Sequence, residues 1–471
     1  MRQAVFLLLC ASVFAATTFV SRLYAEDGPA KPLAKLELQD GDSIVFLGDS
    51  ITHQRLYTQY VEDYFYTRMP HLRLKLHNAG VGGARAWDAL ERFDQDVAAY
   101  KPKYVTILLG MNDGTYQPFN QGIFDTYQQD MTTLLDKLQG IGAVAIPMTP
   151  TMYDSRAERA KQNSKRAADA VALYNSVLAY YGTWLREVSV ERGLGFVDMW
   201  GPLNTITLEQ RKTEPAFTLI KDAVHPGPDG QVVMATAIIN DLGLPRQVSN
   251  INITLPASSD ANPQARASGG KVSDLTVTDD GITFTFAAEA LPWVLPEEAR
   301  LGGKLTRMGH RLGKESLEIH GLPAGQYALV IDGAEAGRYA SAALERHVEL
   351  QENEKTPQFQ QALQVANLNK QRNEGPIGKL RGEWSRFQQF ARTRKAAAEQ
   401  PDNEQVQKQL ATLTEQVNGI EERVAAHNAE AKALEDQIFE INRPVARRYE
   451  LKRVEAPAAA RRRKPAAATA N

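Results

Sequence analysis

The serine best placed to act as a nucleophile is Ser50, which follows an apolar run in the stretch 43–53. Residues 44–47 are apolar and the run stops at Gly48, a pattern that predicts a buried strand of a parallel sheet. Open α/β sheets carry their chemistry at the carboxyl ends of such strands. Ser50 is therefore predicted to lie exposed on a strand-to-helix turn, where its hydroxyl group can attack a carbonyl carbon. The alternative is a purely structural role, since Asp49 and Ser50 are both good helix N-caps.

Three later loops carry further polar residues. Residues 78–83 (Asn-Ala-Gly-Val-Gly-Gly) and 110–113 (Gly-Met-Asn-Asp) each follow an apolar run, and residues 222–226 (Asp-Ala-Val-His-Pro) lie near the end of the α/β pattern. Taken singly, each is also a common turn sequence. The glycines at 80–83 do not complete a dinucleotide-binding fingerprint, because Arg85 occupies the position of its third glycine.

With Ser50, Gly83, Asn112 and His225 in this order, the chain resembles the SGNH hydrolases, also called GDSL-type esterases. The resemblance covers about residues 44–242. The first motif reads Gly-Asp-Ser-Ile, so that an apolar isoleucine stands where the family usually has leucine. The resemblance implies a flavodoxin-like α/β fold of three layers, with a parallel sheet between helices, and ester hydrolysis that needs no cofactor.

The side chains of Ser50, His225 and Asp222 can supply a nucleophile, a base and an orienting carboxylate. A serine hydroxyl group is a weak nucleophile at neutral pH, so a base must take its proton during the attack. His225 is the candidate, because imidazole titrates near neutral pH and can return the proton to the leaving alcohol. Asp222 stands three residues before His225 and can hold the ring in one tautomer. We therefore predict these three residues as catalytic.

The tetrahedral intermediate of acyl transfer carries an oxyanion, and donors aimed at it are usually the largest catalytic contribution. The resemblance implies that these donors are the backbone N–H groups of Ser50 and Gly83 and the side-chain amide of Asn112. A glycine suits the second position because no side chain blocks the approach of the substrate to its backbone. Asp49 is expected to support this arrangement.

Composition limits the other functions. With 471 residues the chain is too long for one ordinary domain, and a hydrophobic share of 43% can supply a large core. The net charge of −2 argues against a dedicated nucleic-acid binder. His53, His71 and His77 show no compact ligand pattern, so we interpret them as surface or supporting residues and expect no metal.

Residues 1–25 are predicted to be an export signal. A positively charged start precedes an apolar run over residues 4–20, and small residues offer a cleavage position after Ala25. The protein is then periplasmic or extracellular. An uncleaved anchor is the alternative, since the run nearly reaches spanning length, and a membrane contact is expected only in that case. Cys10 is the only cysteine and lies in this segment, so the mature chain has no thiol for disulfides or catalysis.

Residues 36–244 are predicted to form the esterase domain, because apolar strands alternate there with amphipathic helices. The predicted strands are 44–47, 74–78, 104–109, 143–148 and 195–198, and the predicted helices include 123–138, 166–192 and 228–242. The loop 149–154 leaves the fourth strand at the same end as Ser50. We expect it to line the substrate cleft, with an ordinary connection as the alternative.

Residues 245–350 show short alternating runs separated by turn residues, which predicts a small β-rich segment. Its expected strands are 272–277, 282–287, 317–319 and 326–331. A carbohydrate-binding module and a cap on the catalytic domain both fit this pattern. Trp293 is the only tryptophan of the segment, which is too little to indicate a sugar platform.

Residues 356–443 are predicted to be helical. Apolar positions from Val406 to Ile441 alternate spacings of four and three, an unbroken heptad series that predicts one helix with a seam for a partner. A break at Pro401 leaves two interpretations open: an antiparallel hairpin within the chain, or self-association as a coiled coil. The basic Ala/Pro-rich tail at 457–471 is predicted to be disordered.

Together these features predict an exported serine esterase that removes a short acyl group, with O-acetyl groups on carbohydrate favoured by the family resemblance. One alternative is a lipid or thioester hydrolase. Another is a non-catalytic scaffold or binding protein that works through the helical region. Every predicted catalytic residue precedes Leu244, so a chain that ends within 241–245 is expected to hydrolyse small activated esters if it folds.

Overall fold

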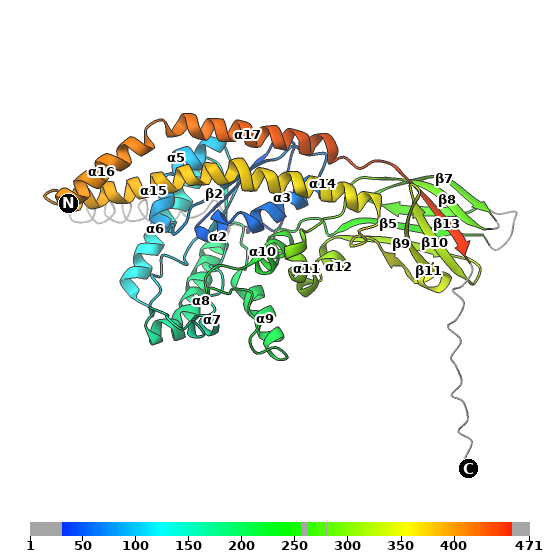
Figure 1. The fold of residues 1–471 in the computed structure, drawn as a ribbon, viewed down its shortest axis with the longest axis horizontal. Coiled ribbons are helices and arrows are strands. Elements are labelled where there is room, and N and C mark those ends of the chain that lie inside the picture. The colour runs from blue at the N-terminus through cyan, green and yellow to red at the C-terminus, as the bar shows by residue number, and fades with distance from the viewer. Residues whose placement is uncertain (1–30, 257–261, 279, 455–471) are drawn as a thin grey trace, which may run out of the picture.

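The computed structural model describes residues 31–256, 262–278 and 280–454. The predicted export signal, Cys10 and the tail at 457–471 lie outside these ranges. An α/β domain is joined to a β-sandwich at one end, and the long helices of residues 357–441 run along one side of the α/β domain (Figure 1). Within the described ranges, no helix combines the length and apolar character needed to cross a membrane.

The α/β domain is built on a parallel sheet, which confirms the predicted fold class. Its strand order is β2-β1-β3-β4, with the strands β1 (Ser43–Gly48), β2 (Lys75–Gly80), β3 (Tyr104–Leu108) and β4 (Val144–Pro147). The predicted fifth strand at 195–198 is reduced to a single parallel bridge between Val197 and Met148. Gly48 pairs with both Gly80 and Leu108, so the loops after β1, β2 and β3 leave the sheet side by side.

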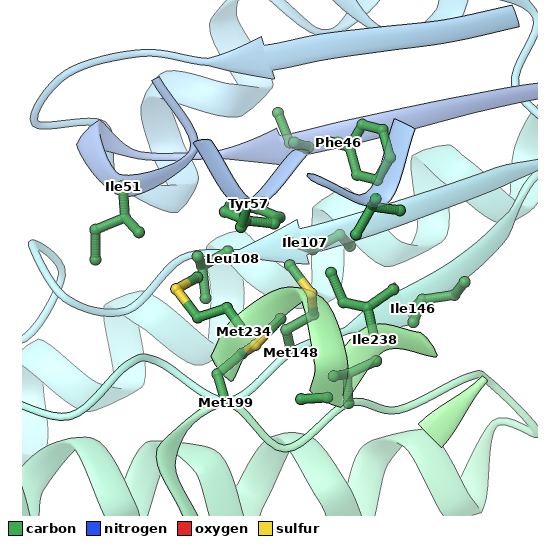
Figure 2. Packing of buried hydrophobic residues seen from close by; sticks show 14 of the residues in the cluster. Phe46, Ile51, Tyr57, Ile107, Leu108, Ile146, Met148, Met199, Met234 and Ile238 are labelled. Atoms are coloured by element: carbon green, nitrogen blue, oxygen red, sulfur yellow. The ribbon is translucent and has the colours of Figure 1, made fainter. Parts of the chain in front are cut away.

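Helices surround this sheet. They are α2 (Ser50–His53), α3 (Leu56–Arg68), α4 (Ala86–Glu91), α5 (Phe93–Asp96), η1 (Ala98–Tyr100), α6 (Gln121–Gly140), α7 (Ser155–Arg159), α8 (Ala168–Glu191), α9 (Trp200–Arg211) and α10 (Pro228–Asp241). On one face, Met234 and Ile238 of α10 pack toward Phe46, Ile107 and Ile146 of the strands (Figure 2). All five side chains are buried, so α10 covers this face of the sheet.

The β-sandwich has two sheets, with strand orders β11-β10-β13-β8-β7 and β12-β9-β5-β6. Its strands are β5 (Gln247–Thr254), β6 (Gln264–Ser268), β7 (Gly270–Thr278), β8 (Gly281–Ala288), β9 (Lys314–His320), β10 (Gln326–Ile331), β11 (Ala334–Ala340), β12 (Val348–Glu349) and β13 (Arg447–Val454). Short helices η2 (Glu297–Ala299), α11 (Arg300–Thr306), α12 (Met308–Leu312) and α13 (Ser341–Arg346) connect them. The strand β13 was not predicted, and it brings the chain back into the sandwich after the helical region.

The helical region consists of α14 (Pro357–Arg372), a π-helical turn η3 (Asn373–Ile377), α15 (Gly378–Glu399), α16 (Glu404–Val417) and α17 (Ile420–Ile441). The prediction of one unbroken heptad helix is wrong. The chain breaks at Gly419, whose φ of +69° belongs to the left-handed region that glycine adopts without strain. Then α16 folds back on α15, and α17 packs on α14 and α15. The seam residues Val424, Ala431 and Ile438 are therefore buried within the chain, as in a helical hairpin.

Buried polar contacts join the helical region to the α/β domain. Arg372 of α14 lies 3.2 Å from Glu62 of α3, and the Asn369 amide donates to Asp63 at 2.8 Å. Side chains of α14 and α15 also belong to the main hydrophobic core. The α/β domain therefore has one face completed by helices that lie far along the sequence.

Candidate active site

Ser50 lies at the start of α2, directly after β1. The cap of this helix is Asp49, whose Oδ1 accepts the N–H of Ile51 at 2.9 Å. Ser50 therefore does not cap the helix, and its hydroxyl group forms a hydrogen bond with a residue far along the sequence. The Oγ of Ser50 lies 2.8 Å from Nε2 of His225, although 175 residues separate them.

The other side of the His225 ring contacts Asp222. Nδ1 of His225 lies 2.6 Å from Oδ2 of Asp222, so a proton on Nδ1 is donated to the carboxylate and leaves Nε2 as the acceptor. The structure thus brings together the three residues that the sequence predicted as catalytic. The side chains of His225 and Asp222 are 32% and 53% exposed, so an ester carried on a large molecule can reach them.

Backbone contacts hold the loop that carries Asp222 and His225. Oδ1 of Asp222 accepts the N–H groups of Val224 at 3.0 Å and of His225 at 2.7 Å. Between them Ala223 adopts a φ of +72°, which is unfavourable for a residue with a Cβ atom and is typical of functional sites. The N–H of Asp154 donates to the carbonyl of Ala223 at 2.9 Å. The loop 149–154, expected to line a cleft, therefore supports the histidine loop.

Electrostatics match the role of a base held by a carboxylate. The hydrogen bond that the His225 ring donates to Asp222 raises the pKa of His225 above its usual value. Partial burial lowers this pKa, and the negative charge of Asp222 raises it further. Partial burial raises the pKa of Asp222, but its hydrogen bonds with the His225 side chain and with backbone N–H groups outweigh this and hold it below its usual range. Asp222 therefore stays ionised over the working pH range.

The side-chain amide of Asn112 lies at the start of the turn that follows β3. Its Nδ2 donates to the carbonyl of Ala84 at 3.1 Å and lies 3.5 Å from Oδ2 of Asp49. Its Oδ1 accepts the hydroxyl group of Tyr116 at 3.1 Å. Because the carbonyl of Ala84 can only accept, its contact fixes which end of the amide carries the N–H groups. Tyr116 was not predicted, because a tyrosine four residues after Asn112 gives no signal of its own in the sequence.

Gly83 lies in the turn after β2, with a φ of +68°. No backbone carbonyl among the described residues accepts its N–H group. This is the state expected of a donor that is reserved for a ligand.

Two buried carboxyl groups brace the loops around these donors. Asp113 accepts the N–H groups of Gly110 at 2.9 Å and of Ala86 at 2.8 Å, which ties the third loop to the second. Burial raises the pKa of Asp113 to about 6 and that of Asp49 to about 7. Asp49, predicted as a supporting residue, thus contacts both the serine helix and Asn112.

The three histidines of the first half have different surroundings. His77 is buried, 3.0 Å from Asp96 and stacked on Tyr100, which excludes a surface position and leaves the interpretation as a supporting residue. Burial lowers the pKa of His77 and of His53 to about 4, which keeps both rings neutral. In the described part of the chain, histidine, cysteine and acidic side chains form no cluster with the geometry of a metal site.

Comparisons with known proteins show which family this part of the chain resembles. Residues 46–233 match the GDSL-like Lipase/Acylhydrolase family. This stretch is a GDSL-type hydrolase domain. A curated relative, the acetylxylan esterase of Geobacillus stearothermophilus, is 25% identical over 229 residues, which cover 44% of this chain and 97% of that protein. The resemblance to SGNH hydrolases predicted from the sequence is thus confirmed.

A solved structure extends the likeness beyond the GDSL domain. It is described as a gut microbial diltiazem-metabolizing enzyme, is 28% identical, and aligns with a TM-score of 0.74 over 90% of this chain and 100% of its own. A match of that extent takes in most of the β-sandwich and the helical region as well as the GDSL domain. The family and the curated relative support an ester hydrolase.

Proposed function

We propose that the GDSL domain is a serine esterase that works through an acyl-enzyme. Ser50 is the nucleophile, His225 the general base, and Asp222 the residue that orients the ring. The oxyanion hole consists of the N–H groups of Ser50 and Gly83 and the amide of Asn112. The observation that carries the proposal is the 2.8 Å distance between Oγ of Ser50 and Nε2 of His225, with Asp222 bonded to the opposite nitrogen.

The reaction has two halves. In the first, Oγ of Ser50 attacks the ester carbonyl while Nε2 of His225 takes its proton, and the carbonyl oxygen becomes an oxyanion bound by the three donors. The intermediate collapses, His225 gives the proton to the leaving alcohol, and the acyl group stays on Ser50. In the second half, a water molecule gives a proton to His225 and attacks the carbonyl carbon of the acyl group. The bond from that carbon to Oγ of Ser50 then breaks, the carboxylic acid leaves, and His225 returns the proton to Oγ.

The proposed substrates are esters of short acids, such as O-acetyl groups on carbohydrate. Support comes from the acetylxylan esterase, 97% of whose length aligns with 44% of this chain. The half-exposed His225 and Asp222 also suit an ester on a polymer. The diltiazem-metabolizing enzyme aligns over 90% of this chain, so small drug-like molecules are a second candidate class. Export through the segment 1–25 fits a polysaccharide substrate and belongs to the same proposal.

The test is a substrate panel on the purified protein. Acetate release from acetylated xylan oligomers is compared with hydrolysis of p-nitrophenyl esters of two to twelve carbons and with turnover of diltiazem. We expect acetyl esters to give the highest kcat/KM and Ser50→Ala to lose nearly all of it. Preference for long acyl chains points to a lipid hydrolase. No turnover of any ester by a folded protein contradicts the proposal and leaves the scaffold interpretation.

A further inference from the structure

The peptide between Gly82 and Gly83 forms the middle of a tight turn. The N–H of Ala84 donates to the carbonyl of Val81 at 3.2 Å, and Gly83, the third residue of the turn, has a φ of +68°. A positive φ at this position is the mark of a type II turn, and type I differs from it by a flip of the central peptide. Because glycine takes positive and negative φ about equally well, the turn itself sets only a weak preference between the two orientations.

Helix α15 binds this central peptide directly. Nε2 of Gln388 donates to the carbonyl of Gly82 at 2.9 Å, and the residue is 5% exposed. The carbonyl of Gly82 and the N–H of Gly83 belong to one trans peptide and point in opposite directions. Holding the first therefore sets the direction of the second. Oε1 of Gln388 has no partner among the described residues, so its contact with Gly82 is the bond that orients this buried amide.

Arg392 lies one turn further along α15 and binds the next carbonyl. Its Nη2 donates to the oxygen of Gly83 at 2.7 Å, and Nε and Nη2 each lie 2.7 Å from the carboxylate of Asp88. Asp88 is buried and accepts the N–H of Arg85 at 2.8 Å. Two successive carbonyls of the turn are thus bound by one helix.

We propose that Gln388 and Arg392 are positioning residues of the oxyanion hole, which hold the Gly82–Gly83 peptide with its N–H group toward the reacting carbonyl. This rests on the proposed function, in which Gly83 supplies one of the donors. The GDSL domain alone does not contain these residues: α15 begins 145 positions after residue 233, where the family match ends. The C-terminal helices thus take part in catalysis by completing the site.

The test compares Gln388→Leu with Arg394→Gln in the full-length protein. Leucine has a similar volume and no donor, so the peptide can flip. Arg394 also joins α15 to α4, through Glu91 at 2.6 Å, but contacts no atom of the glycine turn in the described structure, which makes it the control for weaker helix docking. Loss of a whole oxyanion donor costs about a hundred- to a thousandfold in kcat, so a misoriented donor is expected to cost about ten- to a hundredfold. KM stays within about twofold.

A second measurement reports on the oxyanion hole without turnover. A boronic acid forms a tetrahedral adduct on serine, and its affinity should fall in Gln388→Leu by about the same factor as kcat, while Arg394→Gln keeps both values. If Gln388→Leu fails to fold, Arg392→Met is the second variant, since this side chain is 44% exposed and expected to tolerate the change, with a smaller loss of kcat.

The outcomes separate the two proposals. Unchanged kcat and boronic acid affinity in folded Gln388→Leu and Arg392→Met overturn the positioning role and leave the esterase intact. Equal losses in Arg394→Gln also overturn it, because the effect then comes from helix docking. Full activity of Ser50→Ala refutes the proposed function itself.

Discussion

Arg381 of α15 lies 2.6 Å from Asp96 of α5, and both side chains are fully buried although 285 residues separate them. Arg92 and His77 contact the same carboxylate, at 3.2 Å and 3.0 Å. Burial raises the pKa of Asp96, but Arg381, His77 and Arg92 overcome this and lower it to about 2. Arg92 also donates to the carbonyl of Gly48 at 3.3 Å, so the cluster reaches the strand end that carries the nucleophile.

Removing Arg381 should therefore destabilise the whole protein. In Arg381→Met a buried carboxylate loses its closest cation, and breaking a buried pair in this way costs about 3–5 kcal/mol. The measurement is the urea concentration at the midpoint of unfolding. The control is Arg394→Met, because its pair with Glu91 is half-exposed and worth about 1 kcal/mol or less. Equal midpoints in the two variants would mean that α15 is not anchored through Asp96.

The structure also changes the expectation for a truncated chain. From the sequence, a protein that ends within 241–245 keeps every catalytic residue and is expected to hydrolyse small esters. The structure shows that Glu62 and Asp63 on α3 pair with α14, and Asp96 pairs with α15. Truncation removes the α14 partners of Glu62 and Asp63, takes Arg381 away from Asp96, and uncovers apolar surface. We now predict aggregated or inactive protein, checked by gel filtration and p-nitrophenyl acetate turnover. A monodisperse fragment with wild-type kcat would contradict this.

Local pattern was enough to predict the parallel sheet. The strands β1, β3 and β4 are short and mostly apolar, and a glycine or proline ends β1, β2 and β4, so the type and position of each strand follow from a few neighbouring residues. Pairing over long distances has no such local signal. Strand β13 pairs with β8 and β10, and more than a hundred residues separate it from β10 along the chain. The sequence of β13 itself does not indicate these pairing partners. The break at Gly419 was missed because the apolar spacing continues across it.

The candidate site shows the same division. Ser50, Asp222 and His225 could be predicted because their residue types stand in recognisable motifs, and the structure brings them within hydrogen-bond distance. Tyr116 and Gln388 act through contacts that depend on the fold. Gln388 is 306 residues from Gly82, whose carbonyl it binds. A glutamine in an amphipathic helix gives no sign of such a contact in the sequence.

The acid limb of the pH–rate profile should depend on Asp222. His225 must be neutral to accept the Ser50 proton, so kcat/KM rises with pH through the pKa of His225 in the free enzyme. Asp222 raises that pKa by stabilising the protonated ring. In Asp222→Asn the raised pKa is lost, so the limb should move to lower pH while the maximal rate falls by about a hundredfold or more, because the tautomer is no longer held. A limb that stays at the same pH would show that Asp222 does not act on His225.

The amide of Asn112 should act on the rate rather than on substrate binding. Asn112→Ala is expected to lower kcat by about a hundred- to a thousandfold with a smaller change in KM, as loss of one oxyanion donor does. Tyr116→Phe removes the hydroxyl group that fixes the amide and should give a smaller loss of kcat. Steady-state kinetics on p-nitrophenyl acetate measure both variants. A change confined to KM in Asn112→Ala would assign this residue to substrate binding.

Covalent labelling tests the nucleophile most directly. A fluorophosphonate reacts with an activated serine and stays attached, so intact-mass spectrometry and peptide mapping show how many sites react and which. We predict one adduct, on Ser50 of the wild-type protein, and none on Ser50→Ala, with both proteins showing the same unfolding midpoint within a few degrees. An adduct on another serine, or undiminished ester turnover by Ser50→Ala, would contradict the account of this site.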